Sequence, residues 1–146
     1  MENQYTYSTE VAWTGERRGD LSAPQLPDME VDAPPEFKGH EGVWTPEHLF
    51  VAAVNSCFMT TFLAIAENSK LEFVSFSTQA KGTLEKLDGR GFIMTEVVLH
   101  PKLLVTHARD IERGGRILVK AEKNCLISNS IKSETRLDPE VSSMSE

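Results

Sequence analysis

Residues 45–68 read TPEHLFVAAVNSCFMTTFLAIAEN and contain the clearest helix signal in the chain. Thr45 can cap the helix N-terminus, Pro46 suits the first helical position, and Glu47 in the first turn complements the helix dipole. Six residues then follow helical spacing along one face. They are Phe50, Ala53, Val54, Cys57, Thr61 and Ile65.

Apolar side chains also cover much of the remaining surface of this predicted helix, at Phe58, Phe62 and Leu63. A helix that is apolar nearly all round is buried on most sides, and in so small a domain this suggests that another subunit covers it. Polar residues interrupt the apolar run, so we interpret it as a helix of a soluble protein and not as a membrane span. They are Asn55, Ser56, Thr60 and Thr61.

Strands are predicted on both sides of the helix. Upstream, residues 5–13 alternate and are rich in aromatic and β-branched types, and a short strand is expected at 29–31 within a proline-rich segment. Downstream, residues 74–87 and 93–101 alternate between apolar and polar types. Asp88-Gly89 between them is a strong signal for a two-residue turn, which predicts an antiparallel hairpin with one solvated face.

The C-terminal part predicts a second helix from about residue 106 to 123, followed by Cys125. A short helical turn is expected at residues 128–131 and a last strand at 133–137, whereas residues from 138 onward read as a polar, frayed tail. This order of elements predicts an α+β fold with an antiparallel sheet, formed by residues 1–146 as a single domain.

Composition narrows the possible function classes. The net charge is −7, which argues against nucleic-acid binding and against docking on anionic lipid, because both need a basic surface. Hydrophobic residues make up 40% of the chain, enough for a folded core. Residues 1–10 are polar and contain no signal-peptide pattern, so we expect a cytoplasmic protein.

The two cysteines, Cys57 and Cys125, are the central candidates for chemistry. Neither belongs to a CxxC motif, so zinc and thioredoxin-like sites lack support. A permanent structural disulfide is unusual in the cytoplasm, which leaves buried small hydrophobic residues or redox-active thiols as the two interpretations. Cys125 precedes a predicted helix start, whose positive potential would favour its thiolate.

Charged side chains offer further candidates. Arg17 and Arg18 follow a glycine turn, and an arginine beside a thiol lowers its pKa and can bind the polar head of a peroxide. Both could instead be solvated loop charges, and Glu47 could be an ordinary first-turn carboxylate. The four histidines lack metal-ligand spacing, and the chain has no phosphate-binding glycine loop, so we expect no metal or other cofactor.

Four stretches, in this order along the chain, carry a resemblance to a known family. They are VAWTGxR at residues 11–17, PEFKG at 35–39, TPEHLFVAAxxxCF at 45–58 and AEKxCxxSNS at 121–130. Together they resemble OsmC/Ohr proteins over nearly the whole chain. The resemblance implies a thiol peroxidase that reduces organic hydroperoxides, with hydrogen peroxide as a further possible substrate, and that is recharged by a dithiol or a lipoylated protein.

The resemblance also implies a fold and residue roles. The family forms an intertwined homodimer with long central helices between two antiparallel sheets and active sites at the subunit interface. Cys57 corresponds to the peroxidatic cysteine and Cys125 to the resolving one. Arg17 best matches the family's arginine, with Arg18 as the alternative, and Glu47 matches the carboxylate that pairs with it. Many relatives have proline where this chain has Leu126, which leaves the turn after Cys125 less constrained.

Two expectations about the site extend this hypothesis. Four apolar side chains could wall a pocket for organic peroxides, or could simply pack in the core; they are Phe50, Phe58, Met59 and Phe62. Glu47 and Cys57 are ten residues apart on the predicted helix, which is about 15 Å of rise. One straight helix cannot bring both into one site, so we expect Glu47 to reach Cys57 of the partner subunit.

Two other functions are compatible with the same sequence. The protein could be a redox sensor or small-molecule binder that keeps the fold without turnover, or a purely structural dimer. A sensor or binder would not consume peroxide with any reductant, and a structural dimer would keep both thiols resistant to alkylation in the native state.

Overall fold

The computed structural model describes residues 3–145. The chain forms two compact units, one that ends at Phe50 and one that begins at Val51. Helix α1, Pro46–Asn68, begins in the first unit and continues into the second. The bounds of α1 confirm the helix predicted from the sequence, whereas a single domain for the whole chain stays a prediction.

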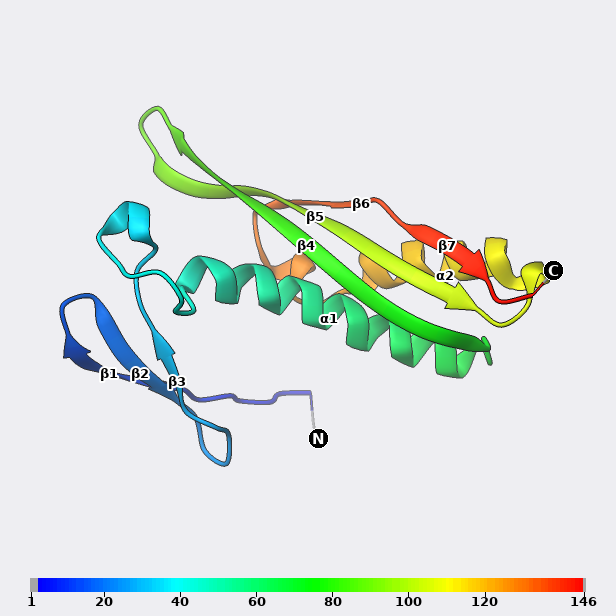
Figure 1. Ribbon diagram of the computed structural model, residues 1–146, viewed down its shortest axis with the longest axis horizontal. Coiled ribbons are helices and arrows are strands. Elements are labelled where there is room, and N and C mark those ends of the chain that lie inside the picture. The colour runs from blue at the N-terminus through cyan, green and yellow to red at the C-terminus, as the bar shows by residue number, and fades with distance from the viewer. Residues whose placement is uncertain (1–2, 146) are drawn as a thin grey trace. The chain divides into compact units, whose positions relative to one another are not determined.

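The first unit contains three antiparallel strands, β1 Glu10–Gly15, β2 Arg18–Ser22 and β3 Met29–Val31, followed by the short helix η1, Pro35–Phe37 (Figure 1). Strand β1 starts later than predicted. Glu10 lies opposite Ser22, so an extension of β1 towards residue 8 would face Pro24. Proline has no N–H to donate to a ladder, which limits the strand at this end.

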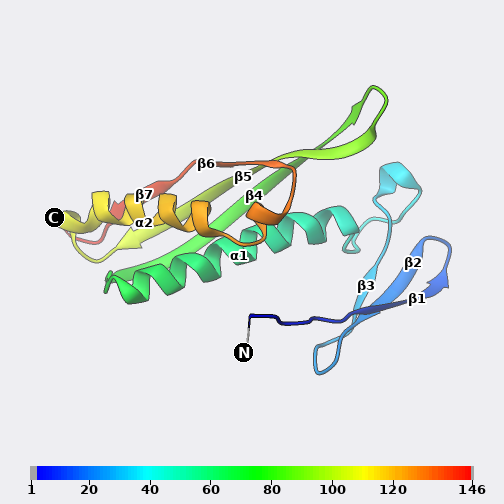
Figure 2. The same cartoon turned by 180° about the vertical axis from the view of Figure 1, so that it is seen from behind.

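The second unit contains a four-stranded sheet with both long helices on one face (Figures 1 and 2). Its strands occur in the order β4-β5-β6, and β7 also pairs with β5. Along the chain the elements are β4 Phe73–Leu87, β5 Gly91–Val105, η2 Ala108–Asp110, α2 Ile111–Asn124, η3 Ser128–Ser130, β6 Glu134–Leu137 and β7 Glu140–Ser143.

The core of the second unit lies between the sheet and the helices. Strand β5 buries every second residue from Val97 to Val105, namely Val97, Leu99, Pro101, Leu103 and Val105. Helix α1 buries the stripe Val54, Phe58, Phe62 and Ala66. The Phe62 ring stacks on Phe76 of β4 with 4.5 Å between ring centroids. Helix α2 can approach β5 closely because Gly114 has no side chain; a Cβ there would lie 3.0 Å from Leu103 Cδ2.

Strand β5 continues through Pro101 to Val105, which corrects the prediction that it ends at Pro101. Pro101 lies opposite Thr78 and has no N–H to donate. The Thr78 carbonyl accepts a 3.0 Å hydrogen bond from Asn55 Nδ2, and the Thr78 hydroxyl donates to Asn55 Oδ1 at 3.0 Å. A side chain of α1 thus supplies a donor where the strand has none.

The C-terminal residues also differ from the prediction. Antiparallel pairing is confirmed within β1–β3 and between β4 and β5, but β6 and β7 both run parallel to β5. The segment expected to be a frayed tail contains β7. The Met144 amide donates to the Val105 carbonyl at 2.9 Å, and Val141 lies beside Gly114 of α2. Pairing and packing therefore order a segment whose composition is polar.

Helix α2 begins later than predicted, whereas α1 is notable for its length and apolar character. Helix α2 starts at Ile111, later than expected, because β5 runs to Val105 and η2 follows it. Among the described residues, α1 is the one helix that is long and apolar enough to cross a membrane. Its buried stripe packs against the phenylalanine side chains of β4.

Candidate active site

Two thiols meet in the second unit, one from each helix. Cys57 lies in the middle of α1 and is partly exposed, whereas Cys125 is the C-cap residue of α2 and is completely buried. The Cys125 Sγ lies 4.0 Å from the Val54 carbonyl oxygen, one turn before Cys57. The two cysteine side chains interact, since the Cys125 thiol lowers the pKa of Cys57, and they form no disulfide. The fold therefore brings together the two cysteines that the sequence singles out.

The surroundings of Cys57 favour its thiolate. Burial by itself raises the pKa of the Cys57 thiol, but hydrogen bonds to the sulfur outweigh burial and lower the pKa below its usual value. The donors, from the largest effect to the smallest, are the Ile127 backbone N–H, the Cys125 thiol, the Thr61 hydroxyl and the Leu126 backbone N–H. The Thr61 Oγ1 lies 3.9 Å from the sulfur, one helical turn further along α1.

The surroundings of Cys125 favour its protonated form. Burial is the largest cause that raises the pKa of the Cys125 thiol. Backbone and side-chain hydrogen bonds from Ser128 lower this pKa, but they do not outweigh burial and the neighbouring Cys57 sulfur, which raise it. The pair thus consists of a sulfur on α1 whose ionised form is favoured and a buried thiol at the end of α2 whose protonated form is favoured.

The turn after Cys125 is held by hydrogen bonds from side chains to backbone carbonyls. Ser128 Oγ donates to the Cys125 carbonyl at 3.1 Å, and Ser130 Oγ donates to the Leu126 carbonyl at 2.7 Å. Asn129 Nδ2 donates to the Lys123 carbonyl at 3.1 Å. With these carbonyls occupied, the turn keeps a shape in which the N–H groups of residues 126 and 127 face the Cys57 sulfur.

The sequence-based expectation for Cys125 is wrong in one respect. A helical turn does follow it, as η3, but the pKa of Cys125 is raised because the side chain is buried. The N–H groups at the start of this turn act on Cys57 instead. The sequence gives no direct sign of Leu126 and Ile127 as partners of Cys57, because every residue type except proline has a backbone N–H. Thr61 is different, because it follows Cys57 by four residues and helical spacing already placed both on one face.

The charged candidates lie in the first unit. Arg18 Nε is 3.5 Å from Asp32 Oδ2, and Arg18 Nη1 is 3.9 Å from Glu30 Oε2. Arg17 is exposed. Glu47 is half-buried, and its Oε1 has no hydrogen-bond partner within the described residues. The ion pairs therefore engage Arg18 within its own unit and distinguish the two arginines that the sequence left as alternatives.

The four apolar candidates for pocket walls divide by burial. Phe58 and Phe62 are completely buried and contact Phe76, so in this chain they have the core role that the sequence left open. Met59 is 37% exposed on α1, and Phe50 is half-buried in the first unit. A contribution to a pocket therefore stays a prediction for Phe50 and Met59.

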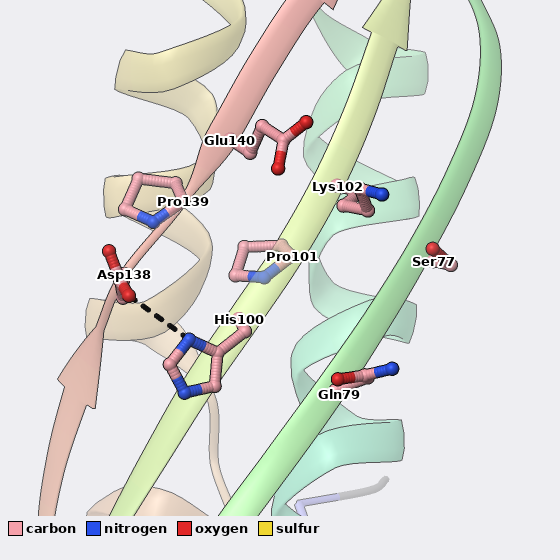
Figure 3. Close-up of a pocket in the computed structure, with 8 residues that line it drawn as sticks. All are labelled: Ser77, Gln79, His100, Pro101, Lys102, Asp138, Pro139 and Glu140. Carbon is pink, nitrogen blue, oxygen red and sulfur yellow. Dashed lines mark hydrogen bonds and ion pairs between the residues drawn. The ribbon is translucent and has the colours of Figure 1, made fainter.

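A separate polar pocket of about 640 Å³ lies on the other face of the second unit's sheet (Figure 3). It is lined by Ser77, Gln79, His100, Pro101, Lys102, Asp138, Pro139 and Glu140. His100 and Lys102 alternate along β5 with Leu99 and Leu103. Those two leucines point into the core between the sheet and the helices. The pocket therefore opens away from α1 and α2 and is distinct from the thiol pair.

The sequence matches a known protein family and resembles individual proteins. Residues 39–140 match the family of OsmC-like proteins. The peroxiredoxin OsmC of Escherichia coli (strain K12) is 30% identical over 107 residues, which are 73% of each chain. The uncharacterised protein YmaD of Bacillus subtilis (strain 168) is 24% identical over 135 residues, or 89% of each chain.

Solved structures share the fold. An OsmC-like protein of unknown function from Vibrio cholerae is 25% identical with a TM-score of 0.85, covering 93% of this chain and 99% of the other. An organic hydroperoxide resistance protein from Elizabethkingia anophelis is 25% identical with a TM-score of 0.77, covering 98% of this chain and 99% of the other.

Proposed function

Because the chain belongs to the family of OsmC-like proteins, we propose that it is a thiol peroxidase that reduces organic hydroperoxides. Members of this family are named peroxiredoxin and organic hydroperoxide resistance protein. The observation that carries the proposal is the pair Cys57–Cys125, which the two helices bring together and whose pKa values shift in opposite directions. A peroxidatic sulfur must be ionised to attack, whereas a resolving thiol can stay protonated until it is needed.

In the first step, the Cys57 thiolate attacks the distal oxygen of the hydroperoxide. The S–O bond forms as the O–O bond breaks, and the alkoxide leaves as an alcohol after it takes a proton from solvent. Cys57 is then a sulfenic acid. The N–H groups of Leu126 and Ile127 hold the attacking sulfur as its thiolate before this step.

In the second step, Cys125 resolves the sulfenic acid. The Cys125 sulfur attacks the Cys57 sulfur, its proton joins the leaving hydroxide, and water departs as the disulfide forms. An external dithiol, either a small molecule or a lipoylated protein, then reduces the disulfide by two exchange reactions and is itself oxidised. The closeness of the two side chains supports this pairing, because the Cys125 sulfur contacts the Val54 carbonyl one helical turn before Cys57.

Arg17 is the arginine that we propose for the site. Arg18 is engaged by Asp32 and Glu30, whereas Arg17 is exposed and can meet a second subunit. The Arg17 guanidinium would stabilise the Cys57 thiolate and polarise the peroxide. Glu47 would hold that guanidinium through a bidentate pair, which would also satisfy the buried Glu47 Oε1.

A homodimer is part of the proposal. Met59 and Leu63 on α1 are 37% and 40% exposed, so the helix presents apolar side chains beyond its buried stripe. A second copy of the chain would cover them. Because α1 is continuous from Pro46 to Asn68, Glu47 and Cys57 of one chain stay about 15 Å apart. We therefore propose that Arg17 and Glu47 face Cys57 of the partner subunit.

The proposal also covers the substrate class, from apolar side chains near the site, and the compartment, from the thiols. Phe50 and Met59 are the apolar side chains that we propose as walls for the organic part of the peroxide. Thiols that must return to the reduced state suit the cytoplasm, where dithiol reductants are maintained. We propose that the protein acts there.

The test is peroxide consumption by the reduced protein with cumene hydroperoxide and dithiothreitol. We expect Cys57→Ser to abolish consumption, because no other group supplies the nucleophile. After one equivalent of peroxide, mass spectrometry should find a Cys57–Cys125 disulfide in the wild type. Cys125→Ser should retain the first oxidation and accumulate sulfenic acid, which dimedone traps.

Ser56→Ala is the matched control, because Ser56 precedes Cys57 and its hydroxyl donates to the Ala52 carbonyl of its own helix. This variant should consume peroxide at the wild-type rate. If the wild type forms the disulfide but consumes no peroxide with any dithiol, the protein is a redox sensor. If neither thiol reacts, the peroxidase proposal is wrong.

A further inference from the structure

A buried carboxylate lies next to the turn that carries Arg17. The Asp32 side chain is 0% exposed and follows β3. Its Oδ1 accepts a 2.7 Å hydrogen bond from the Ala33 N–H, and its Oδ2 accepts one of 3.0 Å from the His40 N–H. Oδ2 also lies 2.9 Å from His40 Nδ1 and 3.5 Å from Arg18 Nε. Asp32 therefore accepts hydrogen bonds from Ala33 and His40 and forms an ion pair with Arg18.

The ionised form of Asp32 is maintained by these contacts. Burial raises the pKa of the carboxyl, but the hydrogen bonds from His40 and Ala33 outweigh burial and lower the pKa below its usual value. A buried carboxylate is unfavourable unless it is paired and hydrogen-bonded. Asp32 consequently holds Arg18 and His40 in place, and replacing the carboxylate releases both.

Both chain neighbours of Arg17 are tied to this cluster. Strand β1 ends at Gly15 and β2 begins at Arg18, so Glu16 and Arg17 form the connection between them. Arg18 faces Asp32, and Glu16 Oε1 lies 3.4 Å from His40 Nε2. Glu16 has a left-handed backbone with φ of 52°, which is unfavourable for a residue with a side chain, and its carbonyl accepts a 3.0 Å hydrogen bond from Trp13 Nε1.

We propose that Asp32 is a positioning residue for the peroxidase reaction: through Arg18 and His40 it fixes the connection at residues 16–17, and thereby the direction of the Arg17 guanidinium. Because Arg18 is drawn towards Asp32, the two adjacent arginines have separate tasks. This inference rests on the proposed role of Arg17. It explains why a chain with two consecutive arginines presents one of them to a substrate.

The alternative is that Asp32 stabilises the first unit without any effect that passes through Arg17. A double-mutant cycle separates the two. The measurement is the second-order rate constant for oxidation of Cys57 by cumene hydroperoxide in single turnovers. It compares the wild type, Asp32→Asn, Arg17→Gln and the double variant.

We expect Asp32→Asn to slow the oxidation about tenfold, because a small displacement of a catalytic group is enough for such a loss. In the Arg17→Gln background the same substitution should have no further effect. A double variant that is again about tenfold slower than Arg17→Gln would overturn the proposal. Asp138→Asn is the control, since it breaks the exposed pair with His100 in the second unit and should leave the rate unchanged.

A replacement variant and a hydrogen-exchange measurement complete the test. If Asp32→Asn does not fold, Arg18→Gln, whose side chain is 38% exposed, takes its place in the cycle with the same expectation. Hydrogen exchange of the amides of residues 14–18 provides a readout that needs no activity. Faster exchange confined to residues 14–18 in Asp32→Asn, compared with Asp138→Asn, supports the positioning role even if the peroxidase proposal fails. Equal exchange, or faster exchange throughout the first unit, contradicts it.

Discussion

The turn after Cys125 and the connection that carries Arg17 are both short segments beside proposed catalytic groups, but they are held in different ways. In the turn after Cys125, Ser128, Asn129 and Ser130 donate to nearby carbonyls, and backbone N–H groups face the Cys57 sulfur. In the connection between β1 and β2, side-chain charges around the buried Asp32 hold the backbone.

Because they are held differently, Cys57 and Arg17 should respond to different perturbations. Backbone N–H groups keep their dipoles in any sequence except one with proline, and salt screens them little at short range. Ion pairs between partly exposed side chains depend on residue identity and weaken as salt rises. We therefore expect the ionisation of Cys57 to be robust to conditions, whereas the positioning of Arg17 is sensitive to them.

The strongest way to break the turn after Cys125 is Ile127→Pro. Ile127 has φ of −68°, which proline can adopt, so the substitution removes mainly the N–H donor. Ile127 gives the largest lowering of the pKa of Cys57, and its loss should move that pKa to higher values. Alkylation of Cys57 by iodoacetamide near neutral pH should slow about tenfold, which corresponds to about one pKa unit.

The pH profile of alkylation checks this prediction. A thiol with a lower pKa ionises at lower pH, so the wild-type profile should rise first and the Ile127→Pro profile should be displaced to higher pH. Ile127→Val keeps the N–H and serves as the control, with an unchanged midpoint. Coinciding profiles for the proline variant and the wild type would show that the N–H does not stabilise the thiolate.

A smaller effect is expected for Leu126→Pro. The Leu126 N–H contributes less to lowering the pKa of Cys57 than the Ile127 N–H does, so alkylation should slow about threefold. The Leu126 side chain is 67% exposed, and Leu126→Ala should therefore leave the rate unchanged. If the alanine variant is as slow as the proline variant, the side chain matters and the backbone donor does not.

Salt should have the smallest effect, and it should weaken the contacts around Asp32 but not those of the turn after Cys125. The side chains of Arg18 and His40 are 38% and 40% exposed, so their contacts with Asp32 and Glu16 are open to screening. Raising the ionic strength about tenfold should slow the oxidation of Cys57 by cumene hydroperoxide about twofold. Alkylation of Cys57 by iodoacetamide, an uncharged probe, should not change; an equal loss in both reactions would place the salt effect at Cys57 itself.

Local signals along the chain predicted much of the fold. The bounds of α1 and the hairpin after β4 follow from residues within a few positions of each other, such as Thr45-Pro46-Glu47 and Asp88-Gly89. The two-residue turn was wrong in length, because Leu87 pairs with Gly91 and the connection comprises residues 88–90. Pro101 and the segment from Asp138 misled the prediction. Asn55 of α1 compensates for the proline, and pairing with β5 orders the polar segment as β7. Both effects come from residues distant in the chain.

The family resemblance is confirmed by the match over residues 39–140, and it singled out both cysteines as candidates from the sequence. It did not predict how their surroundings would differ. The expectation that a helix start would favour the thiolate of Cys125 was wrong, because that thiol is buried while the N–H groups behind it face Cys57. The distinction between Arg17 and Arg18 likewise required Asp32, which no motif indicates.

Local sequence signals are sufficient to predict where the chain forms α1 and the long hairpin, and the sequence names the two sulfurs. The tertiary structure alone decided that Cys57 favours the thiolate and Cys125 the thiol, and that Asp32 engages Arg18. Helix and turn signals act between residues a few positions apart, whereas a pKa or an ion pair depends on every group that folding brings near, whatever its position in the chain.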